Sequence, residues 1–126
     1  MEIRRLSIPD LDPIVAIENA VYPTPWSRSM FAGELAKPSS LSLGAFDPEA
    51  GGLVAYLIVS RYVDAWHIMN VAVHPECRRQ GVASRLLDEL FELTAGDPRR
   101  GYYTDNREDA LIMWKDPIRQ VAAREG

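Results

Sequence analysis

The chain has 126 residues, 47% hydrophobic and 25% charged, which is the balance of a globular protein folding as one domain over residues 1–126. Its formal net charge of -4 argues against a nucleic-acid binder, which would carry a clustered basic excess. The single cysteine, Cys77, excludes an intramolecular disulfide and fits a reducing cytoplasm, and the longest apolar run, Leu53 to Val59, is too short to cross a membrane. We therefore expect a soluble cytoplasmic protein that binds neither nucleic acid nor membrane.

The N-terminal part predicts a strand followed by a helix. Polar and apolar residues alternate over Glu2–Ile8, which favours a strand. Asp10 is expected to cap the following helix through its side chain, and apolar residues at helical spacing continue to Val21. The segment Tyr22-Pro23-Thr24-Pro25 must end that helix, because proline lacks a donor and disfavours helix before it.

A second helix and two strands are predicted next. Ser27 is expected to cap a short helix that runs to Lys37. A strand over Ser40–Phe46 is followed by a turn rich in glycine and acidic residues. The strand over Leu53–Tyr62 is almost continuously apolar, so we expect it to be buried on both faces.

The remaining chain predicts one more long strand, the most regular helix and a closing hairpin. Trp66–Val73 has the pattern of a strand, and apolar residues from Val82 to Leu93 hold helical spacing until Gly96-Asp97-Pro98. Tyr102-Tyr103 and Ala110–Trp114 are then expected to form two final strands around a turn.

The loop Arg78–Ser84 joins a predicted strand to the start of a predicted helix. The first turn of a helix has unbonded N–H groups and a partial positive charge, both of which attract phosphate. Gly81 and Ala83 are small enough for a diphosphate to approach the main chain, and Arg78 and Arg79 add positive charge. A plain turn with solvated arginines is the alternative. The coincidence of these features favours an anion site, although neither the Walker nor the dinucleotide fingerprint is present.

Three segments carry a family resemblance. Asn70–Ala83 closely resembles the coenzyme A-binding motif Arg/Gln-x-x-Gly-x-Gly/Ala of the Gcn5-related N-acetyltransferase (GNAT) superfamily. The loop Glu18–Ser27 and the stretch 100–113 are similar to the RimI branch, which acetylates the N-terminal alanine of a small-subunit ribosomal protein. The resemblance implies the acyl-CoA N-acyltransferase fold, an α/β (α+β) arrangement in which helices flank a mixed, mostly antiparallel sheet.

The resemblance also implies roles for individual positions. Acetyl-CoA would be the cosubstrate, with no metal, and its pantetheine arm and diphosphate would be held by the backbone of a strand and of the loop that follows it. These cofactor positions are Val71, Ala72, Val73, Arg78, Arg79, Gln80, Gly81, Val82, Ala83 and Ser84. The acceptor, a protein N-terminal α-amine, would be framed by Tyr22, Trp26, Tyr102 and Tyr103. For Trp26 a packing role, and for the tyrosine pair a packed hairpin, remain open alternatives.

One part of the family pattern has no counterpart here. The family has a further strand and helix before the closing hairpin, whereas this chain passes from Leu93 through six residues of turn to Arg100. The chain thus lacks the usual fifth strand and fourth helix of the family. Its fourth strand is therefore expected to lose a neighbour, and the unpaired edge would favour self-association. A genuine deletion, an incomplete record and replacement by another subunit would each explain the difference.

The absent segment supplies the general base and general acid of the RimI branch, so no catalytic residue is assigned and weak or absent turnover is expected if the chain is complete. His67 is expected to share a strand face with Met69 and Val71, so it could look towards the cleft, with a half-exposed structural role as the alternative. His74, beside Pro75, is expected to be structural.

Three functions remain in competition at this point. The first is an acetyl-CoA-dependent acetyltransferase acting on protein N-termini. The second is a catalytically impaired protein that binds acetyl-CoA in a regulatory role, and the third is a fragment that needs a partner chain.

Overall fold

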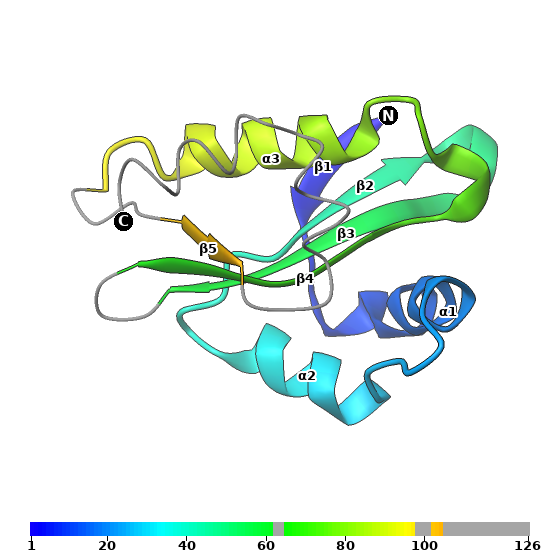
Figure 1. Ribbon diagram of the computed structural model, residues 1–126, viewed down its shortest axis with the longest axis horizontal. Helices are drawn as coiled ribbons and strands as arrows, with labels where there is room; N and C mark the ends of the chain where they lie inside the picture. The colour runs from blue at the N-terminus through cyan, green and yellow to red at the C-terminus, as the bar shows by residue number, and fades with distance from the viewer. Residues whose placement is uncertain (62–64, 98–101, 105–126) are drawn as a thin grey trace.

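A computed structural model describes residues 1–61, 65–97 and 102–104, which form a five-stranded sheet with helices on both faces (Figure 1). The strands are β1 (Glu2–Arg5), β2 (Leu43–Asp47), β3 (Gly52–Arg61), β4 (Trp66–Val73) and β5 (Tyr102–Thr104), and they neighbour one another in chain order. The first four are antiparallel, and β5 runs parallel to β4. The mixed, mostly antiparallel sheet predicted from the sequence is therefore confirmed.

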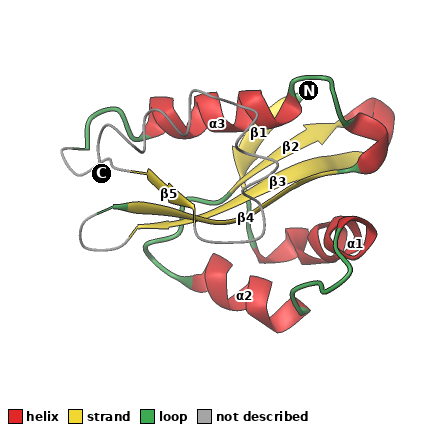
Figure 2. Ribbon diagram, viewed as in Figure 1, coloured by secondary structure: helices red, strands yellow, loops and turns green. Residues whose placement is uncertain are grey.

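In the described part of the chain, α-helices cover both faces of the sheet (Figure 2). They are α1 (Leu11–Val21), α2 (Arg28–Ala36) and α3 (Val82–Leu93), and short 3-10 turns occupy Ile8–Asp10, Pro48–Ala50 and Pro75–Cys77. Helices α1 and α2 lie on one face and α3 on the other, which accounts for the burial of β3 on both sides. Every side chain from Val54 to Ser60 is buried, as its continuous apolar run predicts.

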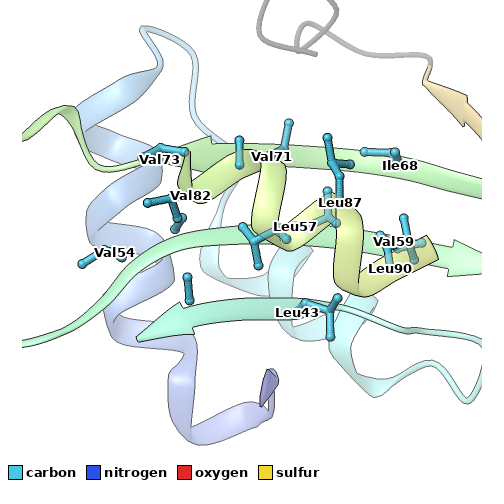
Figure 3. Close-up of a cluster of buried hydrophobic side chains, with 14 of the residues drawn as sticks. Leu43, Val54, Leu57, Val59, Ile68, Val71, Val73, Val82, Leu87 and Leu90 are labelled. Atoms are coloured by element: carbon cyan, nitrogen blue, oxygen red, sulfur yellow. The ribbon is translucent and has the colours of Figure 1, made fainter. Parts of the chain in front are cut away.

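The buried core between α3 and the sheet is largely aliphatic, as Figure 3 shows, and it also includes Trp66. Leu86 and Leu90, one helical turn apart, are both fully buried, and they pack in one cluster with Leu57 and Val59 of β3. Side chains four residues apart share a helix face, so the apolar spacing seen in the sequence becomes this contact surface. The predicted bounds of α3 are confirmed.

The core on the other face joins α1 and α2 to the same strands. Ile14 of α1 and Phe31 of α2 are fully buried there beside Tyr56 and Ile58 of β3. The Phe31 ring meets the Tyr56 ring edge-on, with their centroids 5.6 Å apart. Ser27 caps α2 as predicted, because its Oγ accepts a hydrogen bond from the backbone N–H of Met30 at 3.2 Å.

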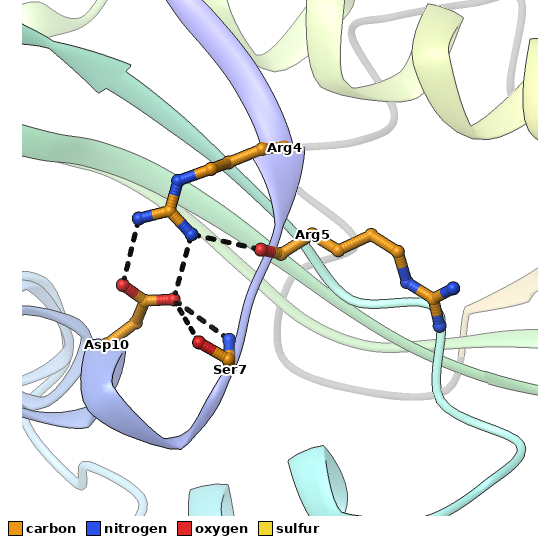
Figure 4. Close-up of polar contacts among 4 residues, drawn as sticks. All are labelled: Arg4, Arg5, Ser7 and Asp10. Atoms are coloured by element: carbon orange, nitrogen blue, oxygen red, sulfur yellow. Dashed lines mark hydrogen bonds and ion pairs between the residues drawn. The ribbon is translucent and has the colours of Figure 1, made fainter.

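The start of α1 differs from the prediction that the Asp10 side chain caps the helix. Asp10 stands at the cap position but makes no side-chain cap bond, because its carboxylate turns back towards β1 (Figure 4). It accepts from the Ser7 N–H at 2.8 Å and from both terminal nitrogens of Arg4, at 3.1 and 3.2 Å. The 3-10 turn Ile8–Asp10 precedes the helix and brings the carboxylate within reach of these donors.

Strand β2 begins three residues later than the predicted Ser40. The hydroxyls of Ser40 and Ser42 bond to each other at 2.9 Å, and Ser42 Oγ also accepts from the Val59 N–H. A side-chain oxygen thus replaces a backbone acceptor opposite β3, and Ser40 keeps only an isolated bridge to Ser60.

The chain returns from α3 to the sheet through Asp97. Its carboxylate accepts from Arg61 Nε at 2.9 Å and from the indole N–H of Trp66 at 3.1 Å, at the ends of β3 and β4. Strand β5 then pairs with Trp66–Ile68, so the expectation that β4 would lack a neighbour is wrong for these residues. The predicted strand over 110–114 lies outside the described residues. Within the described ranges, no helix is long and apolar enough to span a membrane.

Candidate active site

A β-bulge halfway along β4 shifts the alternation of its side chains between the two faces of the sheet. Its register with β3 passes from Val59↔Ile68 to Ile58↔Asn70, so β4 has one additional residue, Met69, at this point. Ile68 and Val71 consequently both pack on the α3 side. His67 therefore lies on the opposite face from Val71, and the prediction that the two share a face is wrong. A strict period of two could not reveal the bulge.

Beyond the bulge, β4 presents backbone groups at an open edge. The His74 N–H bonds to the Val54 carbonyl at 2.8 Å, which fixes the alternation of the antiparallel ladder. Ala72 accordingly directs its N–H and C=O to β3, whereas Val71 and Val73 direct theirs away from it. The described part of β5 pairs only as far as Ile68, so no described strand covers the edge at Val71 and Val73.

The loop after β4 curls its backbone around the start of α3. Arg79 has a φ of 65° and Gly81 a φ of 77°, both in the left-handed region, which is costly for a residue with a side chain. The first intrahelical bond runs from the Arg85 N–H to the Gly81 carbonyl. The N–H groups of Val82 and Ala83 come before this bond, so the helix itself offers them no acceptor. Such a turn leading into a helix N-terminus is a concave arrangement of donors suited to an anion.

The charge around this loop is positive. Arg78, Arg79 and Arg85 are exposed, and none takes part in the four ion pairs found in the described part of the chain. His74 has the structural role predicted, since its Nδ1 accepts from the Glu76 N–H at 3.1 Å. Cys77 is half-buried against the α3 side of the core. The loop thus combines backbone donors with exposed cations.

Of the four predicted acceptor-site residues, two are on the loop between α1 and α2. The Tyr22 hydroxyl donates to the Val71 carbonyl at 2.6 Å, which brings this loop to the open edge of β4. The half-buried Trp26 ring packs on Phe31 with centroids 5.1 Å apart, the packing role left open by the sequence. Tyr102 and Tyr103 form β5 beside Trp66 and His67 in the register of the sheet.

A buried polar cluster beneath this loop was missed by the sequence analysis. Glu18 is fully buried in α1, and its carboxylate accepts hydrogen bonds from the Tyr56 hydroxyl, the Asn70 side-chain amide at 2.9 Å and the Trp26 N–H at 2.8 Å. Burial raises the pKa of the Tyr56 hydroxyl, which therefore stays protonated and can donate. The signal was available: Glu18 follows Ile14 by four residues on the apolar face of α1, and Tyr56 and Asn70 interrupt apolar strands.

An open strand edge thus lies beside a helix start whose backbone donors suit an anion, the arrangement that the resemblance implies for acyl-coenzyme A. The chain belongs to the Acetyltransferase (GNAT) family, whose family model matches residues 11–112. It is accordingly an acetyl-CoA-dependent N-acetyltransferase, as the resemblance predicted. Within the described residues, no group of three His, Cys, Asp or Glu side chains could hold a metal ion.

One curated relative is the ribosomal protein bS18-alanine N-acetyltransferase of Escherichia coli. It is 28% identical over 142 aligned positions, which cover 88% of this chain and 94% of the relative. Since 88% of 126 residues is about 111, about 31 of the 142 positions hold no residue of this chain. This agrees with the strand and helix of the family that have no counterpart in the sequence.

Solved structures share the fold at lower identity. The crystal structure of the Escherichia coli ribosomal-protein-S18-alanine N-acetyltransferase matches with a TM-score of 0.78 and 23% identity, over 92% of this chain and 75% of that one. The PaiA N-acetyltransferase from Thermoplasma acidophilum, in complex with coenzyme A, matches with a TM-score of 0.74 and 16% identity, over 92% and 86%.

Proposed function

We propose that this acetyltransferase acts on the α-amine of a protein N-terminus, with a peptide beginning with alanine, as in the ribosomal protein bS18, as its acceptor. The observation that carries the proposal is the loop between α1 and α2, which meets the open edge of β4 through Tyr22 and Val71. An acceptor held against this loop would lie beside the edge that receives the acyl chain. The name of the Escherichia coli relative supports the same acceptor class.

The cosubstrate would be held by backbone groups on β4 and on the loop that follows. Val71 and Val73 would pair with the pantetheine arm, since their N–H and C=O groups are directed away from β3. The backbone of Arg79–Ser84 would bind the diphosphate, with Arg78 adding positive charge. Acetyl-CoA supplies the activated thioester, and the chain's own residues bind and orient it beside the acceptor.

The choice of an α-amine over a lysine side chain follows from their ordinary pKa values. An α-amino group has a pKa of about 7.7–8.0, so about one molecule in ten is neutral and nucleophilic at pH 7. A lysine side chain, with a pKa of about 10.4, is neutral in fewer than one in a thousand. Because the general base of the RimI branch has no counterpart in this sequence, an acceptor that is already partly neutral is favoured.

The proposal is tested by incubating the protein with acetyl-CoA and a peptide that begins with alanine and contains one internal lysine. Fragmentation mass spectrometry should locate the acetyl group on the α-amine. The matched control is the same peptide with a formylated N-terminus, which should stay unmodified. Acetylation mainly on lysine, or of both peptides equally, would contradict the proposal.

A further inference from the structure

The loop between α1 and α2 is held by one hydrogen bond at its first residue, Tyr22, and by another near its far end, at Trp26. At its first residue, the Tyr22 hydroxyl bonds to the Val71 carbonyl at 2.6 Å. At its far end, the Trp26 N–H bonds to the Glu18 carboxylate at 2.8 Å. Three exposed residues, Pro23, Thr24 and Pro25, lie between these two attachments. These two hydrogen bonds tie the loop to β4 at Tyr22 and to the Glu18 side chain at Trp26.

Glu18 is itself attached to the sheet, so it transmits the position of β4 to the loop. One of its oxygens, Oε1, accepts from Asn70 of β4 and from Tyr56 of β3, while the other, Oε2, accepts from Trp26. Asn70 adjoins Val71, the residue that anchors the other end of the loop. The Glu18 carboxylate thus links Trp26, at the far end of the loop, to Asn70. Asn70 in turn precedes Val71, to which the near end of the loop is bonded.

The orientation of Asn70 follows from the same contacts. Its amide nitrogen faces Glu18, and a flipped amide would instead bring an oxygen against the carboxylate. Its oxygen, Oδ1, is buried and accepts no hydrogen bond in the described structure. An unsatisfied buried acceptor costs free energy. The amide keeps this orientation because the hydrogen bond to a carboxylate is stronger than one between neutral groups.

We propose that Glu18 is a positioning residue for acetyl transfer, which holds the loop Tyr22–Trp26 at a fixed place beside the Val71 edge of β4 and so determines how tightly the acceptor's N-terminus is bound there. This inference rests on the proposed acceptor class. Glu18 lies beneath the loop, fully buried, so it acts through Trp26 rather than by contact with the acceptor. The Glu18 carboxylate would thus have a positioning role in acetyl transfer and no direct chemical one.

The test compares Glu18→Gln with Tyr56→Phe, two variants that each disturb the cluster on one side. The amide that Glu18→Gln introduces can keep its oxygen towards Tyr56 and Asn70, which turns its NH₂ against the Trp26 N–H. This variant should release the loop while keeping the bonds to the sheet. Tyr56→Phe removes one hydroxyl on the sheet side and leaves the bond to Trp26 in place, so it is the matched control for lost stability.

Three measurements are made on each full-length protein: exchange of the Trp26 amide by NMR, affinity for acetyl-CoA by calorimetry, and kcat and KM for the alanine peptide. We expect Glu18→Gln to accelerate Trp26 exchange at least about tenfold and to raise the peptide KM by about tenfold, the effect of losing a hydrogen bond to a charged group. Acetyl-CoA affinity should change less than about twofold. Tyr56→Phe should leave exchange and peptide KM unchanged within about twofold.

Equal peptide KM values in the two variants would overturn the positioning role, as would unchanged Trp26 exchange in Glu18→Gln. If Glu18→Gln does not fold, Tyr22→Phe releases the other end of the loop and should raise the peptide KM where Tyr56→Phe does not; no difference between these two would also overturn it. If the wild type binds acetyl-CoA and peptide without turnover, the proposed function fails. The peptide Kd with coenzyme A present then replaces KM in the same comparison.

Discussion

The two faces of the sheet are built in different ways. Under α3, apolar side chains fill the core, and the buried Thr94 at the end of this helix bonds to the Leu90 carbonyl one turn back. Under α1 and α2, the core contains Glu18, Tyr56 and Asn70, which bond across a helix and two strands. The first arrangement supplies non-directional burial, and the second supplies directional contacts.

The two faces therefore support the two parts of the proposed site in different ways. The α3 face holds the helix start and its loop against β4, which any well-packed set of aliphatic residues could do. The α1 and α2 face holds a loop at a defined distance from a strand edge, which requires hydrogen bonds of particular length and direction. A buried polar network specifies one arrangement, although burying its polar groups costs free energy. The network of Glu18, Tyr56 and Asn70 adjoins the proposed acceptor site.

The largest effect should come from breaking the α3 face. Leu90 is fully buried in the apolar cluster, so Leu90→Ala leaves a cavity and should lower the free energy of unfolding by ~2–5 kcal/mol. Chemical denaturation followed by circular dichroism measures this. Acetyl-CoA affinity of the folded variant should stay within about twofold of the wild type. A loss of stability below ~1 kcal/mol would mean that this face is not the principal support.

A smaller effect is expected at Gly44 of β2, where an added Cβ would crowd side chains on the other face. A Cβ on Gly44 would lie 2.6 Å from Leu6 Cδ2 and 2.9 Å from Leu53 Cδ1, both on the α1 side, so Gly44→Ala should cost ~1–3 kcal/mol. Gly33→Ala is the matched control, since no atom lies within 4 Å of its Cβ and it sits inside α2. The free energy of unfolding of Gly33→Ala should rise by up to ~1 kcal/mol, because alanine has a higher helix propensity than glycine. Thermal unfolding of both variants checks the opposite signs.

The smallest effect concerns the start of α1. Burial opposes ionisation of Asp10, but hydrogen bonds from Arg4 and Ser7 outweigh it and hold the pKa of this carboxyl below its usual value. Its stabilisation is therefore present above the unfolded pKa of about 3.9 and is lost as pH falls through the lower folded pKa. Asp10→Asn should lower the free energy of unfolding by ~1–2 kcal/mol at pH 7, and its difference from the wild type should shrink in acid.

The control for this prediction is Asp12→Asn, the same change at an exposed position. Asp12 pairs with Arg28 on the surface, and its side chain is 83% exposed, so that ion pair should contribute little at any pH. Denaturation curves at pH 7 and pH 3 compare the two variants. A pH-independent loss in Asp10→Asn would contradict the assigned pKa shift.

Periodic features were predictable from the sequence, and features that depend on distant partners were not. The apolar spacing of α3 and the burial of β3 followed from patterns within one segment. The bulge at Met69 depends on the register of two strands, so it reversed the expected face of His67. The side-chain cap expected of Asp10 was lost to a partner on β1, Arg4. The cluster around Glu18 joins residues up to 52 positions apart, which no local pattern could assemble.

The most direct test of the central claim, that the loop after β4 holds acetyl-CoA, is calorimetric titration of the wild type, Gly81→Val and Gly51→Val. Both glycines have positive φ, 77° and 94°, and open space at the Cβ position, so valine strains the backbone at either site. Only Gly81 lies in the proposed diphosphate loop. We expect acetyl-CoA to bind the wild type and Gly51→Val alike, within about twofold, and to bind Gly81→Val at least about tenfold more weakly. Equal affinity in all three proteins, or no binding to the wild type, would contradict the account.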